Sequence, residues 1–323
     1  MSRPDTKGTH LFSGTRRGFL GTVAAATAAG AVWAEESANP WRPRWILASA
    51  LYGPFSLKEI LPEVRKTGAA MIDLWPKPHG TQREEVDSLG ADRVREMLAA
   101  AEVTLGGIAC YMVGPFNLAG EFAVATRLGA AAPTLVTMAP GDGGLRGDAL
   151  IAAIKAFLEK LRPSIAAAEE AGGVIAIENH SHSLLQSPEG IRRFAELAAH
   201  ERVGVALAPH HLPQDGELVA AIARDLGPKL KFVYAQQHGK GSKEKLPKAD
   251  ELSQMPGRGP LDFGPLMREL AAMRFDGPVE IFMHPVPRGV PILESIDQIT
   301  AEVNLARDHL VSAGADPRPT GSR

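Results

Sequence analysis

Residues 174–182 read Val-Ile-Ala-Ile-Glu-Asn-His-Ser-His, which is a short apolar run followed at once by polar side chains. Apolar residues without polar alternation are typical of a strand buried on both faces of a parallel sheet. Glu178 would then lie at the buried end of this strand, where a carboxylate needs a hydrogen bond, a countercharge or a metal ion to offset its desolvation. The stretch predicts a parallel sheet with a polar site where its strands end.

Seven other short apolar runs occur along the chain, at residues 45–51, 70–74, 104–111, 134–138, 203–207, 230–235 and 278–283. Segments with apolar residues at helical spacing separate them. Eight strand–helix units in strict alternation predict an α/β fold with a single (β/α)8 TIM barrel, whose domain spans residues 35–323 and whose core spans 44–312. An open, doubly wound sheet is the alternative, and the lack of a dinucleotide-type glycine motif after the first strand disfavours it.

The first 34 residues have the features of an export signal. Arg16 and Arg17 precede an Ala- and Gly-rich apolar run at residues 21–32, and small residues follow at the positions that a signal peptidase reads. Residues 1–34 therefore resemble a twin-arginine signal peptide, which predicts a periplasmic or secreted protein. The apolar run is shorter than the ~20 residues of a membrane-spanning helix, so we expect no membrane anchor after cleavage.

The composition fits a soluble globular protein and excludes several kinds of site. Of 323 residues, 45% are hydrophobic and 22% are charged, and Cys110, as the only cysteine, rules out an intramolecular disulfide or a cysteine-rich metal site. Without residues 1–34 the chain has 31 Lys and Arg against 36 Asp and Glu, a net charge of −5. This excess of acidic residues argues against nucleic acid as a partner. The sequence does not decide whether the protein forms a homo-oligomer.

Polar and aromatic residues follow the predicted strands, which is where TIM barrels place their catalytic residues. The set consists of Tyr52, Trp75, Glu178, His180, His211, Gln236, His238, Lys240, His284 and Arg288. Six of the ten histidines follow the last four strands, whereas scattered surface histidines would not gather on one rim. Neutral imidazoles with one carboxylate suit Zn²⁺, Mn²⁺, Fe²⁺ or Ni²⁺ better than Mg²⁺ or Ca²⁺. The rim predicts a site for a divalent transition metal, and a metal-free site is the alternative.

Three stretches resemble the xylose-isomerase-like barrel superfamily of sugar isomerases, sugar epimerases and related enzymes. They are Ala176–His180 after the fifth strand, Met255–Phe263 before the seventh helix, and Phe275–Ile281 leading into the eighth strand. The resemblance covers nearly all of residues 44–310 and implies the TIM barrel fold. The resemblance does not identify a single reaction, because isomerases, epimerases, dehydratases, lyases and nucleases share this fold.

Members of that superfamily typically bind a divalent metal through Glu, Asp, His and Glu from strands five to eight. Glu178 matches the first ligand, and His211 keeps the histidine of the second motif, but Ala208 replaces its aspartate. Residues 234–236 hold no histidine at the third place, and Phe282 stands at the fourth. His238 and His284 lie close in sequence to the places of the missing ligands. We therefore expect an altered metal site whose ligands are Glu178, His211, His238 and His284.

The resemblance and the polar rim together imply an enzyme that removes a proton from the carbon next to a carbonyl of a carbohydrate, as sugar isomerases and epimerases do. Such a step needs a base and an electrophile. Glu178 is the candidate base, and His211 is the candidate second acid or base. The predicted substrate-binding residues are Tyr52, Trp75, His180, Gln236, Lys240 and Arg288.

Two other functions stay open at this point. One is a lyase or hydratase that acts on an oxidised (keto) glycoside and begins with the same removal of a proton. The other is a non-catalytic periplasmic carbohydrate-binding barrel, which the missing ligands at Ala208 and Phe282 favour. A metal-dependent nuclease of this fold would need a basic face, and the net charge disfavours it.

Overall fold

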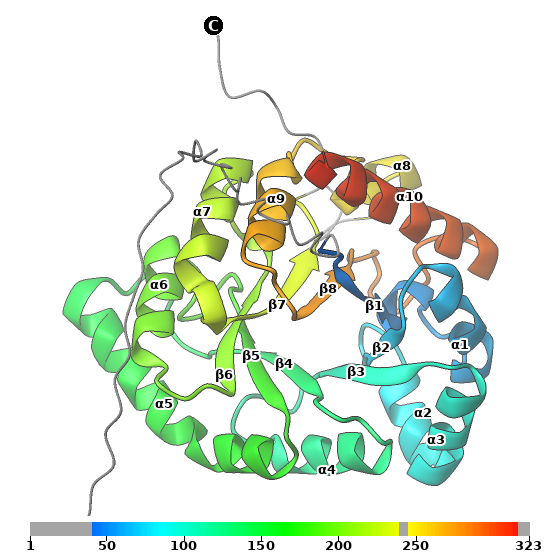
Figure 1. Cartoon of the computed structure of the whole chain (residues 1–323), viewed down its shortest axis with the longest axis horizontal. Helices are drawn as coiled ribbons and strands as arrows, with labels where there is room; N and C mark the ends of the chain where they lie inside the picture. Colours follow the sequence, from blue (N-terminus) through cyan, green and yellow to red (C-terminus); the bar gives the residue numbers. More distant parts are fainter. Residues whose placement is uncertain (1–40, 239–244, 316–323) are drawn as a thin grey trace, which may run out of the picture. The chain divides into compact units, whose positions relative to one another are not determined.

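The computed structural model describes residues 41–238 and 245–315. Eight parallel strands in this part of the chain pair in sequence order, and β8 pairs with β1 to close the barrel (Figure 1). The prediction of a single (β/α)8 TIM barrel is confirmed, and the open-sheet alternative is wrong. The strands are β1 (Arg44–Ala48), β2 (Met71–Leu74), β3 (Thr104–Ala109), β4 (Thr134–Met138), β5 (Val174–Glu178), β6 (Val203–Leu207), β7 (Leu230–Ala235) and β8 (Pro278–Ile281).

Helices between the strands form the outer ring of the barrel (Figure 1). Two short turns of 3-10 helix, Ser49–Tyr52 and Pro209–His211, follow β1 and β6 at the rim. The helices are α1 (Leu57–Lys66), α2 (Gln82–Leu89), α3 (Ala91–Ala100), α4 (Ala119–Arg127), α5 (Gly147–Glu170), α6 (Pro188–Leu197), α7 (Gly216–Leu226), α8 (Lys248–Glu251), α9 (Gly264–Ala272) and α10 (Ile296–Ala315).

Capping residues determine where the helices after β5 and β6 begin. The Ser187 side chain accepts a hydrogen bond from the backbone N–H of Gly190 at 3.1 Å, and Pro188 occupies the first position of α6. Asp215 caps α7 in the same way through two backbone N–H groups of its first turn. These caps fix the far ends of the two loops that carry the polar residues after β5 and β6.

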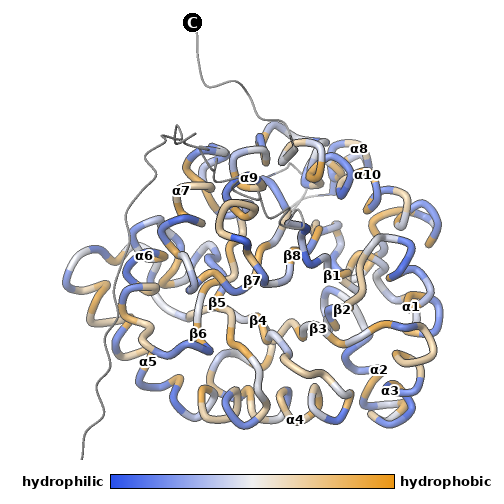
Figure 2. Tube along the Cα trace, in the orientation of Figure 1, coloured by the Kyte–Doolittle hydropathy of each residue, from blue (hydrophilic) through white to orange (hydrophobic). Residues whose placement is uncertain are grey.

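The strands are buried on both faces, as their apolar sequences predict. All five residues of β6 are buried, and in β1, β5 and β7 only residues near the start are exposed or partly exposed. Figure 2 shows hydrophobic residues along the strands and alternating hydrophobic and hydrophilic stretches along the helices. Side chains fill the barrel interior, so a cavity can form only where the strands end.

The predicted signal peptide, residues 1–34, lies outside the described residues, as do Lys240 and both predicted ends of the domain. Within the ranges 41–238 and 245–315, no helix combines the length and the apolar character that crossing a membrane requires.

Candidate functional site

A cavity, about 530 Å³ with the space open to solvent included, lies at the carboxyl ends of the strands. Larger and shallower hollows lie along α5 and α6, at the amino ends of the strands and beside α1. We place the candidate active site in the smaller cavity, because barrel enzymes carry out their chemistry at the carboxyl ends. Its walls consist of Trp75, His79, Tyr111, Met138, Glu178, His180, Tyr234, Gln236, Phe282, His284 and Arg288.

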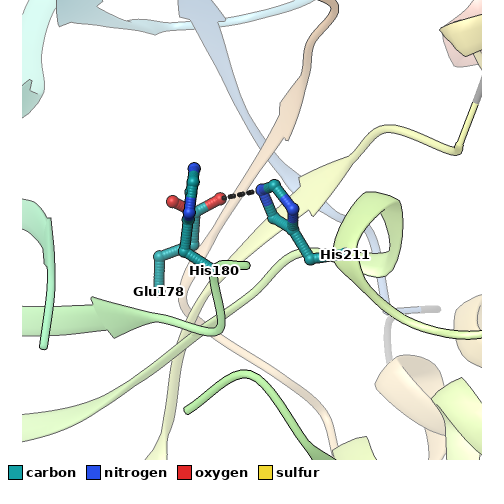
Figure 3. Close-up of side chains that lie close together, drawn as sticks. All are labelled: Glu178, His180 and His211. Carbon is teal, nitrogen blue, oxygen red and sulfur yellow. Dashed lines mark ion pairs between the residues drawn. The ribbon is translucent and has the colours of Figure 1, made fainter. Parts of the chain in front are cut away.

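Glu178, His180 and His211 form a compact cluster at this cavity (Figure 3). One carboxylate oxygen and one nitrogen from each ring lie within 4.8 Å of one another. Nε2 of His211 is 3.6 Å from Oε1 of Glu178, and the centroids of the two imidazole rings are 4.1 Å apart. Three ligands of this kind leave positions open on a divalent ion, as catalytic metal sites require.

Hydrogen bonding determines which nitrogen of His180 can bind a ligand. Nδ1 lies 2.7 Å from the carbonyl oxygen of Ser181, and because a carbonyl can only accept, Nδ1 carries the proton. Nε2 therefore has a free lone pair, which a metal ligand needs, and the bond to Ser181 holds the ring in place. The two imidazoles and the carboxylate fit the divalent transition metal that the sequence predicts.

Asn179 positions His211 relative to Glu178. Its side chain accepts a hydrogen bond from the backbone N–H of Ala208 at 2.7 Å and donates one to the Ala208 carbonyl at 3.0 Å. Asn179 is fully buried, so both bonds are shielded from water. This double contact joins the end of β5 to the end of β6, and the turn that carries His211 begins directly after it. The alanine that replaces the expected aspartate is thus held through its backbone.

Glu178 is ionised although only 6% of the residue is exposed. Burial raises the pKa of its carboxyl group, but His211, whose Nε2 lies beside the carboxylate, together with His180 and Tyr111, outweighs burial and lowers the pKa below its usual value. A buried carboxylate beside two imidazoles can accept a proton or bind a cation.

Arg288 and two histidines form a second group in the cavity wall. Nη1 of Arg288 donates to Nδ1 of His284 at 2.6 Å and to Nδ1 of His79 at 3.3 Å. Because a guanidinium cannot accept, both rings accept through Nδ1. Burial, followed by the charge of Arg288, lowers the pKa of His79 to about 4 and the pKa of His284 well below its usual value. Both rings are therefore neutral and carry their proton on Nε2.

The structure does not bring His284 or His238 into the cluster of Glu178. Nδ1 of His284 accepts from a guanidinium and its Nε2 carries the proton, so this arrangement offers no lone pair to a metal, and the role of His284 as a metal ligand stays a prediction. His238 is exposed, and its ring lies 5.5 Å from that of His210, outside the cluster. His180, which the sequence assigned to substrate binding, takes the third place. It follows Glu178 by two residues, a period that puts two side chains on one side of an extended chain.

The two aromatic residues predicted to bind a sugar ring are placed differently. Tyr52 is fully buried with its hydroxyl 2.9 Å from Oγ1 of Thr300, so its predicted role at the mouth is wrong. The cause is the 3-10 turn after β1, which ends the extended strand before residue 52. Trp75 does line the cavity, but its ring stacks on Phe282 and on Tyr111 at 4.5 and 5.6 Å. With 2% of Trp75 exposed, little of its face is left for a sugar.

Gln236 lines the cavity near the place of the third expected metal ligand. It is buried, and its Nε2 donates to Oε1 of Gln254 at 2.9 Å. Gln254 in turn donates to the His284 carbonyl at 2.8 Å and accepts from the His284 backbone N–H at 3.1 Å. The two glutamines therefore fix the chain at the end of β8.

A pair of buried carboxyl groups, which the sequence analysis missed, lies one layer below the cavity. Asp73 and Glu280 precede Trp75 and Phe282 by two residues and share their inward face. Neither carboxyl has a hydrogen-bond donor, and the indole N–H of Trp75 approaches them without forming a bond. Burial raises the pKa of Asp73 to about 7, and burial and the charge of Asp73 raise that of Glu280 well above its usual value. The pair therefore holds a proton near neutral pH. Its signal in the sequence is an acid within each of two apolar runs.

Several solved structures share the fold of this chain. D-psicose 3-epimerase from Clostridium cellulolyticum H10, solved with D-tagatose, is 15% identical, with 84% of this chain and 99% of that chain covered and a TM-score of 0.61. The IOLI protein with a bound zinc atom is 16% identical, with coverages of 84% and 98% and a TM-score of 0.63. The probable 3-DHS dehydratase AsbF from Bacillus anthracis is 11% identical, with coverages of 81% and 98% and a TM-score of 0.59.

These identities show a shared fold and leave the reaction to be argued from the site. A comparison with curated proteins found no match. The family model described as xylose isomerase-like TIM barrel matches residues 61–302, which is most of the barrel. By this match and by its closed eight-stranded barrel, the chain belongs to the xylose isomerase-like TIM barrel family.

Proposed function

We propose that this protein is a metal-assisted isomerase or epimerase that moves a proton on the carbon next to a carbonyl group of a carbohydrate. The observation that carries this proposal is the cluster of Glu178, His180 and His211 at the cavity. The D-psicose and L-ribulose 3-epimerases among the similar solved structures support this class of reaction.

Glu178, His180 and His211 would hold the ion. Two imidazoles and a carboxylate suit Zn²⁺, Mn²⁺, Fe²⁺ or Ni²⁺, and the zinc atom in the IOLI structure supports a metal in this family. When bound, such an ion supplies a Lewis acid that polarises a carbonyl oxygen.

Glu178 is the proposed base. Its lowered pKa keeps it ionised and able to accept a proton. A carboxylate has two oxygens, so one can contact a cation while the other accepts the proton. The hydroxyl of Tyr111 contacts this carboxylate and lies 3.1 Å from the hydroxyl of Tyr234. The two tyrosines thus help to orient Glu178.

His211 is the proposed second proton-transfer residue when no ion lies between it and Glu178. Its Nε2 is 3.6 Å from Oε1 of Glu178, which a small movement brings within range of proton transfer. The buried rings of Trp75 and Phe282 and the partly buried ring of Tyr111 line the cavity. Their exclusion of water strengthens the electrostatic interactions of Glu178 with substrate.

A non-catalytic carbohydrate-binding barrel is the second candidate, and Ala208 and Phe282, at the places of two expected metal ligands, favour it. A lyase or hydratase on a keto glycoside would begin with the same proton removal and is a variant of the main proposal.

Solvent-deuterium exchange tests the main proposal. The protein, supplied with Mn²⁺ or Zn²⁺, is incubated in D₂O with D-psicose, D-tagatose, D-fructose or L-ribulose, and NMR measures deuterium next to the carbonyl. We expect incorporation that falls roughly 100-fold or more in Glu178→Gln and strongly in His211→Ala. Glu159→Gln, on the exposed surface of α5, is the control and should not change the rate.

Exchange that Glu178→Gln leaves unchanged would contradict the role of Glu178 as base. Binding of these sugars without exchange of any of them would favour the non-catalytic barrel.

We also propose that the chain is exported by the twin-arginine route, a proposal supported by the sequence of residues 15–34. Fractionation of cells that express the full chain should recover it outside the cytoplasm. A variant with Arg16→Lys and Arg17→Lys should remain inside. Equal distribution of the two proteins would refute the proposal.

A further inference from the structure

Arg288 is a cation at the cavity without an acidic partner among the described residues. Within residues 41–238 and 245–315, its hydrogen bonds run only from Nη1 to the neutral rings of His284 and His79. A guanidinium has five N–H donors, and Nη1 supplies two of them. The Nε and Nη2 protons therefore remain available, and this edge of a guanidinium matches the two oxygens of a carboxylate.

His79 and His284 add two further donors to the same wall. Because each ring accepts through Nδ1, each carries its proton on Nε2. Neither Nε2 has an acceptor in the described part of the chain, and the ring centroids are 5.0 Å apart. Arg288, His79 and His284, here called the donor cluster, thus offer several N–H groups to the cavity and no acceptor.

The loops that carry the donor cluster are packed against each other and hydrogen-bonded to the barrel. Gly289 has a φ of 82°, and a Cβ at this position would lie 2.6 Å from the carbonyl oxygen of Pro78. The loop after β8 therefore packs directly against the loop after β2. The side chain of Gln254 fixes the backbone of His284 through two hydrogen bonds. A preorganised group of donors costs less entropy when it binds a ligand.

The charges at the cavity favour a monoanion as the ligand. Glu178 is negative, and Arg288 lies near enough for the two charges to interact. Among the described residues that line the cavity, Arg288 is the one permanent cation. In the metal-free protein a carboxylate would balance Arg288 one to one, whereas a doubly charged phosphate would leave an unbalanced negative charge facing Glu178.

We propose that the donor cluster binds the carboxylate of an acidic sugar and so orients its carbonyl end towards Glu178. This inference rests on the proposed function and names its substrate class as sugar acids. Neutral sugars would leave the guanidinium unpaired, and sugar phosphates would carry excess charge.

Calorimetric titration of EDTA-treated protein tests this proposal without contributions from metal. The probes are matched sets of D-glucuronate, D-glucose and D-glucose 6-phosphate, together with the corresponding galactose and mannose series. In at least one set we expect the uronate to bind roughly tenfold or more tightly than the hexose and the phosphate, by about 1.4 kcal/mol or more. Arg288→Met should remove this preference, and Arg288→Lys should restore only part of it, because an ammonium cannot bind in the bidentate manner.

Arg162→Met, an exposed substitution on α5, is the control for the loss of one positive charge. Circular dichroism checks that each variant is folded. Equal affinity for uronates and hexoses, no binding of any probe, or a preference that survives Arg288→Met would overturn the proposal. Tighter binding of the phosphates would overturn the assignment to carboxylate. Deuterium exchange into neutral ketoses combined with one of these results would leave the proposed reaction intact and remove only the substrate class.

Discussion

Replacing Glu280 by glutamine is expected to stabilise the barrel above pH 7. Asp73 and Glu280 face each other without donors in the barrel interior, and ionising both places two negative charges in a dry environment. An amide at position 280 could donate a hydrogen bond to the Asp73 carboxylate. The substitution keeps the shape of the side chain and removes the repulsion.

The magnitude follows from the pKa of Glu280, which burial and then the charge of Asp73 raise well above its usual value on folding. A carboxyl whose pKa is raised in the folded state binds its proton more tightly there. The stability that this proton confers is present below about pH 4 and is lost progressively as the pH rises. Each pH unit over which Glu280 keeps its proton in the folded chain but not in the unfolded chain costs about 1.4 kcal/mol, and relaxation of the site would reduce this cost. We therefore expect Glu280→Gln to exceed the wild type by roughly 2–4 kcal/mol at pH 8, with a smaller difference at pH 4.

Urea denaturation of both proteins at intervals from pH 4 to pH 8 measures this effect. The difference between the two curves isolates the pair from the other titrating groups, and Glu159→Gln on the surface is the control. Parallel pH dependences, or a Glu280→Gln protein less stable than the wild type at pH 8, would refute the account of a shared proton.

Three further predictions concern the walls of the cavity. Asn179→Ala should lower the free energy of unfolding by about 2 kcal/mol, because it leaves the buried backbone N–H of Ala208 without a partner and removes one of the two hydrogen bonds to the Ala208 carbonyl; a loss below about 1 kcal/mol in urea denaturation would contradict the clamp. Phe282→Ala should cost about 3–5 kcal/mol and change the near-ultraviolet circular dichroism of Trp75, and an unchanged spectrum would argue against the stack. Zn²⁺ at 100 times its Kd should stabilise the wild type by about 2.7 kcal/mol in thermal denaturation; an equal effect on Glu178→Gln would place the ion elsewhere.

The fold could be predicted from the sequence because its signals are local. Unbroken apolar runs such as 174–177 mark strands buried on both faces, and Ser187-Pro188 marks the start of α6. Closure of the barrel follows from eight such units in strict alternation. The ends of the strands could not be predicted as well as their existence. The apolar run at 45–51 continues beyond β1 into a 3-10 turn, and this turn places Tyr52 in the core.

The site could be predicted only as far as strand ends determine it. Glu178 and His211 follow neighbouring strands, and the structure places them 3.6 Å apart. The protonation state of His284 depends on the loop that brings Arg288 to its Nδ1. The conformation of that loop cannot be predicted from a periodic sequence pattern. His180 was separated from the metal set because the resemblance implied one ligand from each strand, whereas the end of β5 and the residues after it bring two candidate ligands together.

The buried carboxyl pair was missed for a different reason. Asp73 and Glu280 lie on strands that meet only through β1, so their proximity depends on closure of the barrel. Each acid taken alone resembles an ordinary residue at a strand end. Their shared proton becomes visible only when both are placed on the inward face.

The metal content of the purified, untagged protein tests the central claim most directly. After loading with Zn²⁺ and removal of excess metal, elemental analysis should find one ion per chain in the wild type and in His238→Ala. His180→Ala and Glu178→Gln should lose it, because the cluster rather than the rim histidines holds the ion. A wild type without metal, or a His180→Ala protein that keeps its ion while His238→Ala loses it, would contradict this account of the site.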